Sequence, residues 1–576
     1  MSRSMANEGI QVDATELATQ LRTRGLVRTI VDLECWHLNG NASELIETIA
    51  HILNTTDAPP IVFYIEDALE ELDRSRLFLV ENVLCDLIPL LNVEQDIIHL
   101  FIMHLLDAGC DGALIASFGE WTKKDSKRSE KVYKSARNGD NLALRLLSTV
   151  LLINSDVDES IIFAKAHKQE AKLAAISALG SMELGDRYSE VIDILFQCAS
   201  SEDEDICLRS IEAGYRAAAK RKAYAPVGFE KRLEQILFTL SPSTIHFAVN
   251  LLTRHRESLT EDAIVLCLGA AAHVDPDNAS TLSLIDHALY QLVSVGRTEQ
   301  VIPLLSELID RSKGRITFDS LQSTYHALNQ AGYDVLGSAV VYWLLNAGAY
   351  TRKCLAYKVC GVGNDVPSFS IPSSSLPSDP SDQLFLCRKA IGWFFIDPLA
   401  VVTILLAVLR NGSPDIKNDV LELIYDPLLL SYGGKLKSYL EQCVVEGGGN
   451  SSGLAELLAR KTALDDALEG IERLVELHPN EMQREVERVQ WHEQMERSIP
   501  QGRRKSIFDD IFTNQYILYG RSSLTSVHTG EGKTNLTEIE MTSFSITSEL
   551  PLLNIVDPIG LDHMLFNFRL EQRESR

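Results

Sequence analysis

The chain has 576 residues, of which 45% are hydrophobic and 23% are charged. These values are ordinary for globular proteins and exclude wholesale disorder. The formal net charge is −26, from 80 acidic and 54 basic residues, so a phosphate backbone would be repelled unless one face were locally basic. The length is too great for one compact core, but it suits an elongated array of helical repeats.

The N-terminus and the cysteines indicate the compartment. Residues 1–12, which we expect to be disordered, lack the apolar core of a signal peptide. The ten cysteines include no C-x-x-C pair, and most lie among apolar residues at helical spacing. In a chain of this length they indicate buried free thiols in a reducing environment, so we expect a cytoplasmic protein.

Residues 13–362 are predicted to form the first part of a helical array. Apolar residues recur there at spacings of three and four, beginning with Leu17, Leu21, Val27 and Ile30. Short polar turns interrupt the pattern repeatedly. Helices of about three turns joined by a few residues stack as neighbouring antiparallel pairs. The pattern therefore predicts an all-α fold.

The clearest repeat unit lies between Glu170 and Lys220. Its first expected helix is EAKLAAISALGSM, followed by a turn at residues 184–186. The second is RYSEVIDILFQCAS, and the third opens on the acidic run SSEDED, which suits a helix N-terminus.

This stretch resembles HEAT and armadillo repeats. The resemblance lies in the A-x-x-A-L-G ending of the first helix, the short Gly-Asp turn, and the acidic-capped helix that carries Arg209. A weaker echo begins at Ser413. The resemblance implies an α-solenoid of stacked antiparallel helix pairs with a long concave face that binds partners.

Two breaks interrupt the predicted array, which continues over residues 384–499. Residues 363–383 contain four prolines and seven serines and are expected to form an exposed loop. Residues 446–453, EGGGNSSG, are expected to be a flexible connector. The run Glu481–Arg497 alternates acidic and basic residues, which predicts a solvent-exposed helix with i,i+4 ion pairs.

One stretch, Ala390–Leu409, is apolar enough to be considered as a membrane span. It contains Asp397 followed by Pro398, a helix-capping residue and then a favoured first helical residue. A helix that begins there is too short, because crossing a bilayer takes about 20 apolar residues. We predict a buried helix of the array and no membrane span.

The composition changes at Pro500, so residues 500–576 are expected to form a separate tail. Residues 516–527 and 534–548 alternate well enough for strands, and HTGEGK at 528–533 supplies the turn of a β-hairpin. A short helix is predicted at Gly560–Glu571. Because a lone hairpin is marginal in water, it should dock on the solenoid or pair with another chain's edge.

No motif for catalysis, a cofactor or a metal withstands inspection. Gly532-Lys533-Thr534 has Val527 where a phosphate-binding loop needs glycine. Residues 449–453 fit the letters G-x-S-x-G of a nucleophile elbow, but a glycine-rich linker explains them better. The fourteen histidines give no H-E-x-x-H, and no Cys/His set has zinc spacing. We expect no catalytic, cofactor or metal residues.

Two basic stretches, residues 121–137 and 216–222, could contact nucleic acid from helical faces. Interleaved Asp125 and Glu130, together with the overall negative charge, favour solvated faces instead. Nucleic acid is therefore not the expected partner.

These patterns favour a non-enzymatic scaffold or adaptor that binds a protein partner through the solenoid surface and the tail. Self-association through the hairpin is the other use considered for the tail. The alternative is an enzyme or nucleic-acid-binding protein whose site is assembled on the concave face. The expected partner-binding residues are Tyr516, Tyr519, Arg521, Phe544, Met564 and Phe568.

Overall fold

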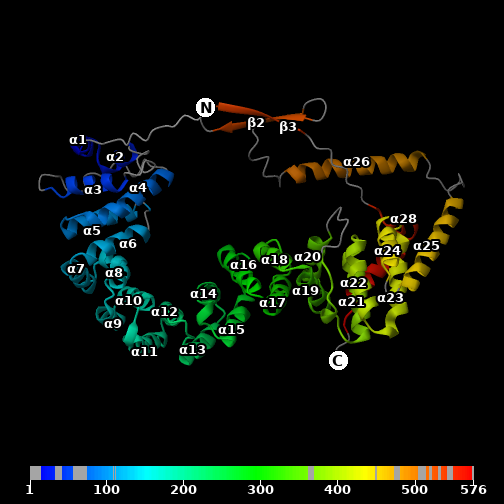
Figure 1. Ribbon diagram of the computed structural model, residues 1–576, viewed down its shortest axis with the longest axis horizontal. Helices are drawn as coiled ribbons and strands as arrows, with labels where there is room; N and C mark the ends of the chain where they lie inside the picture. Colours follow the sequence, from blue (N-terminus) through cyan, green and yellow to red (C-terminus); the bar gives the residue numbers. More distant parts are fainter. Residues whose placement is uncertain are drawn as a thin grey trace. The chain divides into compact units, whose positions relative to one another are not determined.

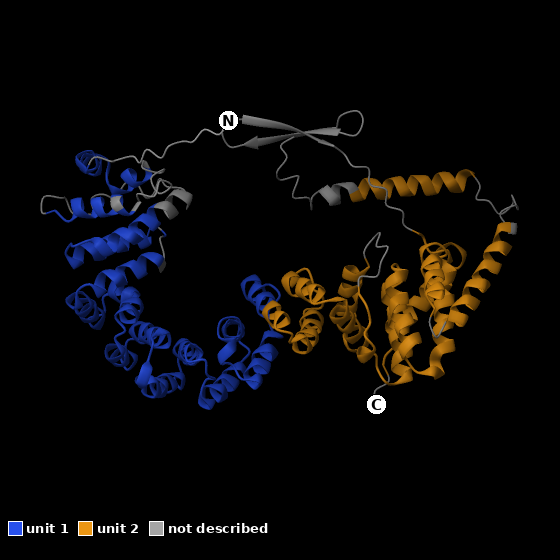
Figure 2. Cartoon of the chain, in the orientation of Figure 1, with its two compact units in different colours: residues 1–288 blue, residues 289–576 orange. Residues whose placement is uncertain are grey.

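The chain divides into two compact units, residues 1–288 and residues 289–576 (Figure 2). The computed structural model describes residues 14–32, 42–55, 74–107, 109, 112–360, 369–447, 451–471, 481–503, 514–517, 522–529, 533–540 and 549–573. The stretch 1–12 lies outside these residues. Both units are built from stacked helices, and α16 (Ala279–Ser294) runs across the boundary.

Unit 1 is helical throughout its described residues. Its helices before α16 are α1 (Ala14–Arg24), α2 (Leu26–Asp32), α3 (Ala42–Leu53), α4 (Arg74–Leu87), α5 (Gln95–Asp107), α6 (Gly112–Lys123), α7 (Ser126–Arg137), α8 (Asn141–Asn154), α9 (Val157–Ala164), α10 (Gln169–Ser181), α11 (Tyr188–Ala199), α12 (Glu204–Lys220), α13 (Val227–Leu237), α14 (Pro242–Arg254) and α15 (Glu261–Ala271).

The helices of unit 1 stack as successive pairs. Helix α10 packs on both α8 and α12, while α11 packs on α9, α12 and α13. In Figure 1, α10, α12 and α14 lie on one side of the stack and α9, α11 and α13 on the other. Contacts with the next helix but one are the signature of a helical solenoid. The predicted solenoid fold is therefore confirmed.

The repeat unit predicted at 170–220 corresponds to α10, α11 and α12. Asp203 caps α12, since its side chain accepts a hydrogen bond from the Ile206 N–H at 3.0 Å. The glycine of the A-x-x-A-L-G pattern has a packing role: a Cβ at Gly180 would lie only 2.6 Å from the Cα of Ala213. Glycine at this position lets α10 and α12 approach backbone to backbone.

Unit 2 is also built from stacked helices, and it holds the tail. Its helices are α17 (Thr298–Arg311), α18 (Gln322–Gln330), α19 (Tyr333–Asn346), α20 (Ala349–Val359), α21 (Pro380–Phe394), α22 (Pro398–Asn411), α23 (Lys417–Leu423), α24 (Lys435–Glu446), α25 (Ser451–Ile471), α26 (Glu481–Arg503), α28 (Leu553–Val556) and α29 (Pro558–Leu570). Its strands are β1 (Asn514–Ile517), β2 (Ser522–Thr529) and β3 (Lys533–Glu540).

The apparent membrane span is divided between α21 and α22. Asp397 caps α22, accepting a hydrogen bond from the Ala400 N–H at 3.1 Å, and Pro398 is the first helical residue. Helix α22 is almost entirely buried from Leu399 to Leu409. Among the described residues, no helix combines the length and hydropathy needed to cross a bilayer. The predicted buried helix is confirmed.

Both predicted breaks end earlier than expected. Helix α21 begins inside the range 363–383 because Asp379 caps it, accepting from the Ser381 N–H at 2.7 Å. The described part of that loop is also not wholly exposed, since Phe369 is buried. Helix α25 begins at Ser451, inside the expected connector 446–453.

The charged run forms α26, as predicted. Every side chain from Glu481 to Ser498 is exposed. Arg488 pairs with Glu485 three residues before it, and Arg497 pairs with Glu493 four residues before it. Pairs at these spacings support an isolated helix.

The strands of the tail pair antiparallel in the order β1-β2-β3. Tyr516 lies opposite Leu524, and Ser526 lies opposite Leu536. The expected strand bounds were wrong: residues within the range 516–527 belong to two strands, β1 and β2, rather than to one. Helix α29 begins two residues earlier than expected because Asp557 caps it, accepting from the Gly560 N–H at 2.9 Å.

The cysteines that the structure describes are all free. Burial raises the pKa of the Cys267 thiol to about 12, and it does the same for Cys387. Cys35 and Cys110 lie outside the described residues.

Candidate functional site

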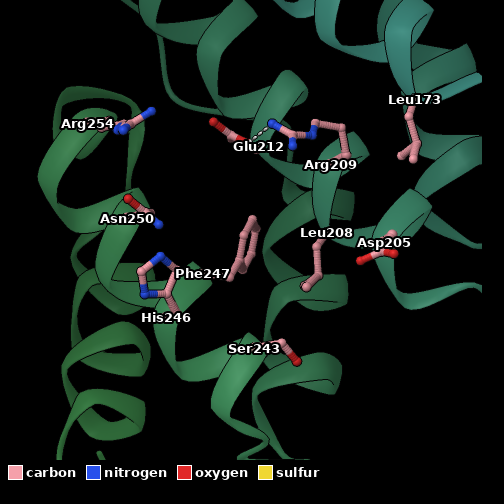
Figure 3. A pocket seen from close by; sticks show the side chains of 10 residues that line it. All are labelled: Leu173, Asp205, Leu208, Arg209, Glu212, Ser243, His246, Phe247, Asn250 and Arg254. Atoms are coloured by element: carbon pink, nitrogen blue, oxygen red, sulfur yellow. Dashed lines mark hydrogen bonds and ion pairs between the residues drawn. The ribbon is translucent and has the colours of Figure 1, made fainter. Parts of the chain in front are cut away.

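Unit 1 contains a groove of about 570 Å³ between helices α10, α12 and α14 (Figure 3). This volume is in the usual range of ligand pockets, roughly 300–1,000 Å³. We call this pocket the α12–α14 groove. It is lined by Leu173, Asp205, Leu208, Arg209, Glu212, Ser243, His246, Phe247, Asn250 and Arg254.

The sequence directs these side chains into the groove through helical spacing. Ser241 caps α14, accepting a hydrogen bond from the Thr244 N–H at 3.2 Å, and Pro242 starts the helix. His246, Asn250 and Arg254 then follow at four-residue intervals, so they share one face. Figure 3 shows this row across from Arg209 and Glu212 of α12.

The inner wall of the groove is apolar. Phe247 is only 8% exposed, and Leu208 and Leu173 are half-buried beside the cavity. A floor of this kind under a polar rim is the usual composition of a binding site. It offers burial to one apolar side chain of a ligand.

Glu212 is the electrostatic centre of the groove. Its carboxylate accepts a hydrogen bond from Arg209 at 3.2 Å and another from Arg216 at 2.5 Å. His255 Nε2 lies 3.8 Å from Glu212 Oε1, too far for a hydrogen bond, and is a buried nitrogen without a hydrogen-bond partner among the described residues.

Burial and the neighbouring polar groups change the pKa of Glu212 in opposite directions. Burial by itself would raise the pKa of the carboxyl, but His255, Arg216 and Arg209 together lower that pKa to about 2. At neutral pH the group is therefore a stable carboxylate. It cannot serve as a general acid there, and such a weak base is a poor proton acceptor.

No metal site adds chemistry to this part of the chain. Within the described ranges, no group of three or more His, Cys, Asp or Glu side chains is arranged to hold an ion.

Two polar side chains on the rim are open to a ligand. Arg254 is exposed and Asn250 is half-buried. Neither has a hydrogen bond or ion pair with the residues that the structure describes. An amide can both donate to and accept from a peptide backbone, and a guanidinium binds carboxylates in bidentate fashion.

Some of the basic side chains in the two basic stretches pair with acidic residues of the same unit. Lys131 pairs with Asp96, Arg137 with Glu159 and Lys220 with Glu183. Arg128 and Arg221 stack instead on the rings of Trp121 and Tyr188, at 4.1 and 4.5 Å. Lys123, Lys124, Lys127 and Lys134 of the first stretch are exposed, so a weak contact with nucleic acid on this face stays an open alternative.

The two motif resemblances have the wrong surroundings for chemistry. Lys533 begins β3 opposite Thr529 of β2, whereas a phosphate-binding loop leads from a strand into a helix. Ser451 begins α25, and the preceding element is helix α24, whereas a nucleophile elbow follows a strand.

The residues expected to bind a partner are not brought together by the described structure. Tyr516 is in β1 and pairs with Leu524, while Tyr519, Arg521 and Phe544 lie outside the described residues. Met564 and Phe568 are half-buried on α29, a helix that packs against α21 of the same unit. A role for these residues in binding stays a prediction.

The α12–α14 groove could not be predicted from the sequence. Its rim comes from two helices whose facing residues are about 40 positions apart, so no local pattern contains it. One signal was present: His246, Asn250 and Arg254 form a polar row within the otherwise mostly apolar PSTIHFAVNLLTR.

Comparison with known proteins adds no family. No family model and no curated protein sequence matches the chain. Two solved structures with 12% sequence identity cover 80% of it: an engineered protein from a structural genomics consortium, with a TM-score of 0.18 and 96% of that chain covered, and UNC-45 from Drosophila melanogaster, with a TM-score of 0.22. The match spans 65% of the Drosophila protein. At these TM-scores, neither likeness bears on function.

Proposed function

We propose that the protein is a non-enzymatic scaffold or adaptor that holds a segment of a partner protein in the α12–α14 groove. The observation that carries the proposal is the pair of open rim groups, Asn250 and Arg254, above the buried ring of Phe247. A peptide with an apolar side chain next to an acidic one fits this arrangement. The apolar group would cover the floor and the carboxylate would reach Arg254.

The fold supports this proposal in general terms. Stacked helix pairs bury a continuous core and leave long faces free for binding. Arg209 and Arg216 already pair with Glu212. The negative charge of Glu212 therefore repels an acidic ligand less strongly than an unpaired carboxylate would. The fold alone does not specify the chemistry of the bound segment or the place where it binds.

The test is affinity purification of the full-length chain from its native host, followed by mass spectrometry. Arg254→Glu should reduce recovery of the partner at least about tenfold, which corresponds to about 1.4 kcal/mol of binding free energy. Lys231→Glu makes the same charge change on α13, at an exposed residue outside the groove, and should leave recovery unchanged. Equal recovery by the two variants would reject the groove as the binding site.

The tail is proposed as a second contact with the partner. Replacing residues 514–540 with a flexible linker of equal length removes the strands but leaves residues 549–573 in place. Recovery of the partner should fall while helix content stays near that of the wild type. Unchanged recovery would show that the tail has no part in binding.

A further inference from the structure

Residues 549–573 pack within unit 2 against helices that lie far earlier in the chain. Glu549 accepts hydrogen bonds from the backbone N–H groups of Gly434 and Lys435, at 2.6 and 3.1 Å. The Leu552 N–H donates to the Ser431 carbonyl at 2.9 Å. Helix α29 then packs along α21. We call residues 557–573 the return segment.

Two charged pairs hold the end of the return segment. Arg388 on α21 donates to both carboxylate oxygens of Glu571, with distances of 2.6–3.0 Å. Arg573 donates in turn to both carboxylate oxygens of Asp382, at 2.7 and 2.5 Å. Two-pronged pairs of this kind fix geometry as well as supplying attraction. The two pairs therefore favour a segment that carries Glu571 and Arg573 over a helix of any other sequence.

A buried lysine beneath the return segment is a third element of recognition. Lys389 is fully buried, and its ammonium donates to the carbonyl oxygens of Arg569 and Glu571, at 2.8 and 2.5 Å. Both acceptors belong to the return segment. A buried cation needs acceptors, so this part of α21 is complete only when a helix C-terminus lies on it.

The packing shows that the helix is attached by one face. Leu561 and Leu565 are buried, whereas Ile559, Phe566 and Leu570 on the other side are 83%, 57% and 61% exposed. Gly392 of α21 allows the close approach, since a Cβ there would lie 3.1 Å from both Phe568 Cβ and the Arg569 nitrogen. The helix therefore contacts unit 2 through one face only, and its other face is open to solvent.

We propose that this face of α21 is a recognition site for a helix whose C-terminal end carries the sequence Arg-x-Glu-x-Arg, and that the return segment is its exchangeable ligand. Tethering gives the return segment an effective concentration on the order of millimolar. The cis ligand therefore fills the site unless it is weakened. The same segment of a second copy is then the occupant that replaces it. This site is in unit 2, and the inference does not rest on the α12–α14 groove.

The test uses the full-length chain and a fluorescent synthetic peptide of residues 553–573. Glu571→Ala with Arg573→Ala in the chain weakens the cis ligand, so this variant should bind the peptide in an anisotropy titration. The wild type should bind it at least about tenfold more weakly, because its own segment competes. A peptide that carries the same two alanines should not bind.

Variants on the receiving side complete the test. In the weakened chain, Arg388→Ala should abolish peptide binding. Arg460→Ala removes another arginine of unit 2, one that pairs with Glu422 instead, and should have no effect. Absence of binding by the weakened chain, or equal binding with and without Arg388, would overturn the proposal.

Hydrogen exchange separates release of the segment from unfolding. In the weakened chain, faster exchange should be confined to residues 549–573. If exchange also rises throughout α19, α21 and α22, the return segment is an integral part of the core and the proposal is wrong.

Discussion

Glu212 illustrates how a half-buried carboxylate is kept ionised by its neighbours. Its side chain is 16% exposed, and two arginines from its own helix, one on each side of it in sequence, donate to it. Spacings of three and four residues place such groups on one helical face. The local sequence RSIEAGYR thus builds the ion cluster, and only His255 comes from elsewhere.

This cluster makes a pH-dependent contribution to stability. The folded pKa of Glu212, about 2, lies below the ordinary unfolded value of about 4.3. The ionised form is therefore the one that the fold stabilises. Its contribution is fully present above about pH 4.5 and is lost as the pH falls through about 2.

Glu212→Gln should lower the free energy of unfolding by about 1–3 kcal/mol near neutral pH, because Arg209, Arg216 and His255 lose the negative charge beside them. The difference from the wild type should shrink as the pH is lowered from about 4.5 toward 2. Urea unfolding followed by circular dichroism at several pH values measures it. A difference that does not change with pH would show that the charge of Glu212 is not the stabilising feature.

At the level of helices and strands, close packing between α10 and α12 depends on Gly180. Alanine favours helix over glycine by about 1 kcal/mol, so an uncrowded Gly→Ala change stabilises a helix. At Gly180 the added Cβ would meet backbone and side-chain atoms of Ala213 at 2.6–2.9 Å. Overpacking costs typically about 1–3 kcal/mol and should outweigh the propensity gain.

Gly180→Ala is therefore expected to destabilise the protein, whereas Gly269→Ala is expected to be neutral or stabilising. Gly269 is in α15, where an added Cβ meets nothing within 4 Å. Thermal unfolding of the two variants beside the wild type compares them directly. Two shifts of the same sign would contradict the close approach of α10 and α12.

The helices that could be predicted are those whose signals are local. Asp397 before Pro398 and the acidic run before Ile206 mark helix starts, and the start of α22 falls at its predicted residue for that reason. The bounds of the strands were assigned poorly because alternation alone does not show where one strand ends and the next begins. The docking of Glu571 on Arg388 could not be foreseen, since the partners are 183 residues apart.

The candidate groove escaped prediction for a related reason. Its residues become neighbours only once α12 and α14 have a fixed register, and the sequence specifies that register through side-chain packing such as that of Phe247 and Leu208. A polar row on α14 was visible, but such rows are usually solvated faces. Helix capping and hydrophobic periodicity show where helices begin and end. Which residues of two helices face each other depends on the packing of the whole stack.

At the scale of the molecule, the helical stacks are built mainly from contacts between neighbouring helices, and in unit 2 the packing of α29 on α21 adds a long-range contact. In such arrays a surface is assembled by adjacent pairs and does not require the whole chain. The α12–α14 groove therefore belongs to unit 1, and the site of the return segment belongs to unit 2. We expect the two sites to be separable by mutation, with Arg254 affecting one and Arg388 the other.

The central claim is that a partner protein binds in the α12–α14 groove. The most direct test is hydrogen exchange of the full-length protein, with and without the partner recovered by affinity purification. The account predicts that the partner slows exchange in residues 204–220 and 242–254, and that Arg254→Glu abolishes this protection. Protection confined to other helices, with none on α12 or α14, would contradict it.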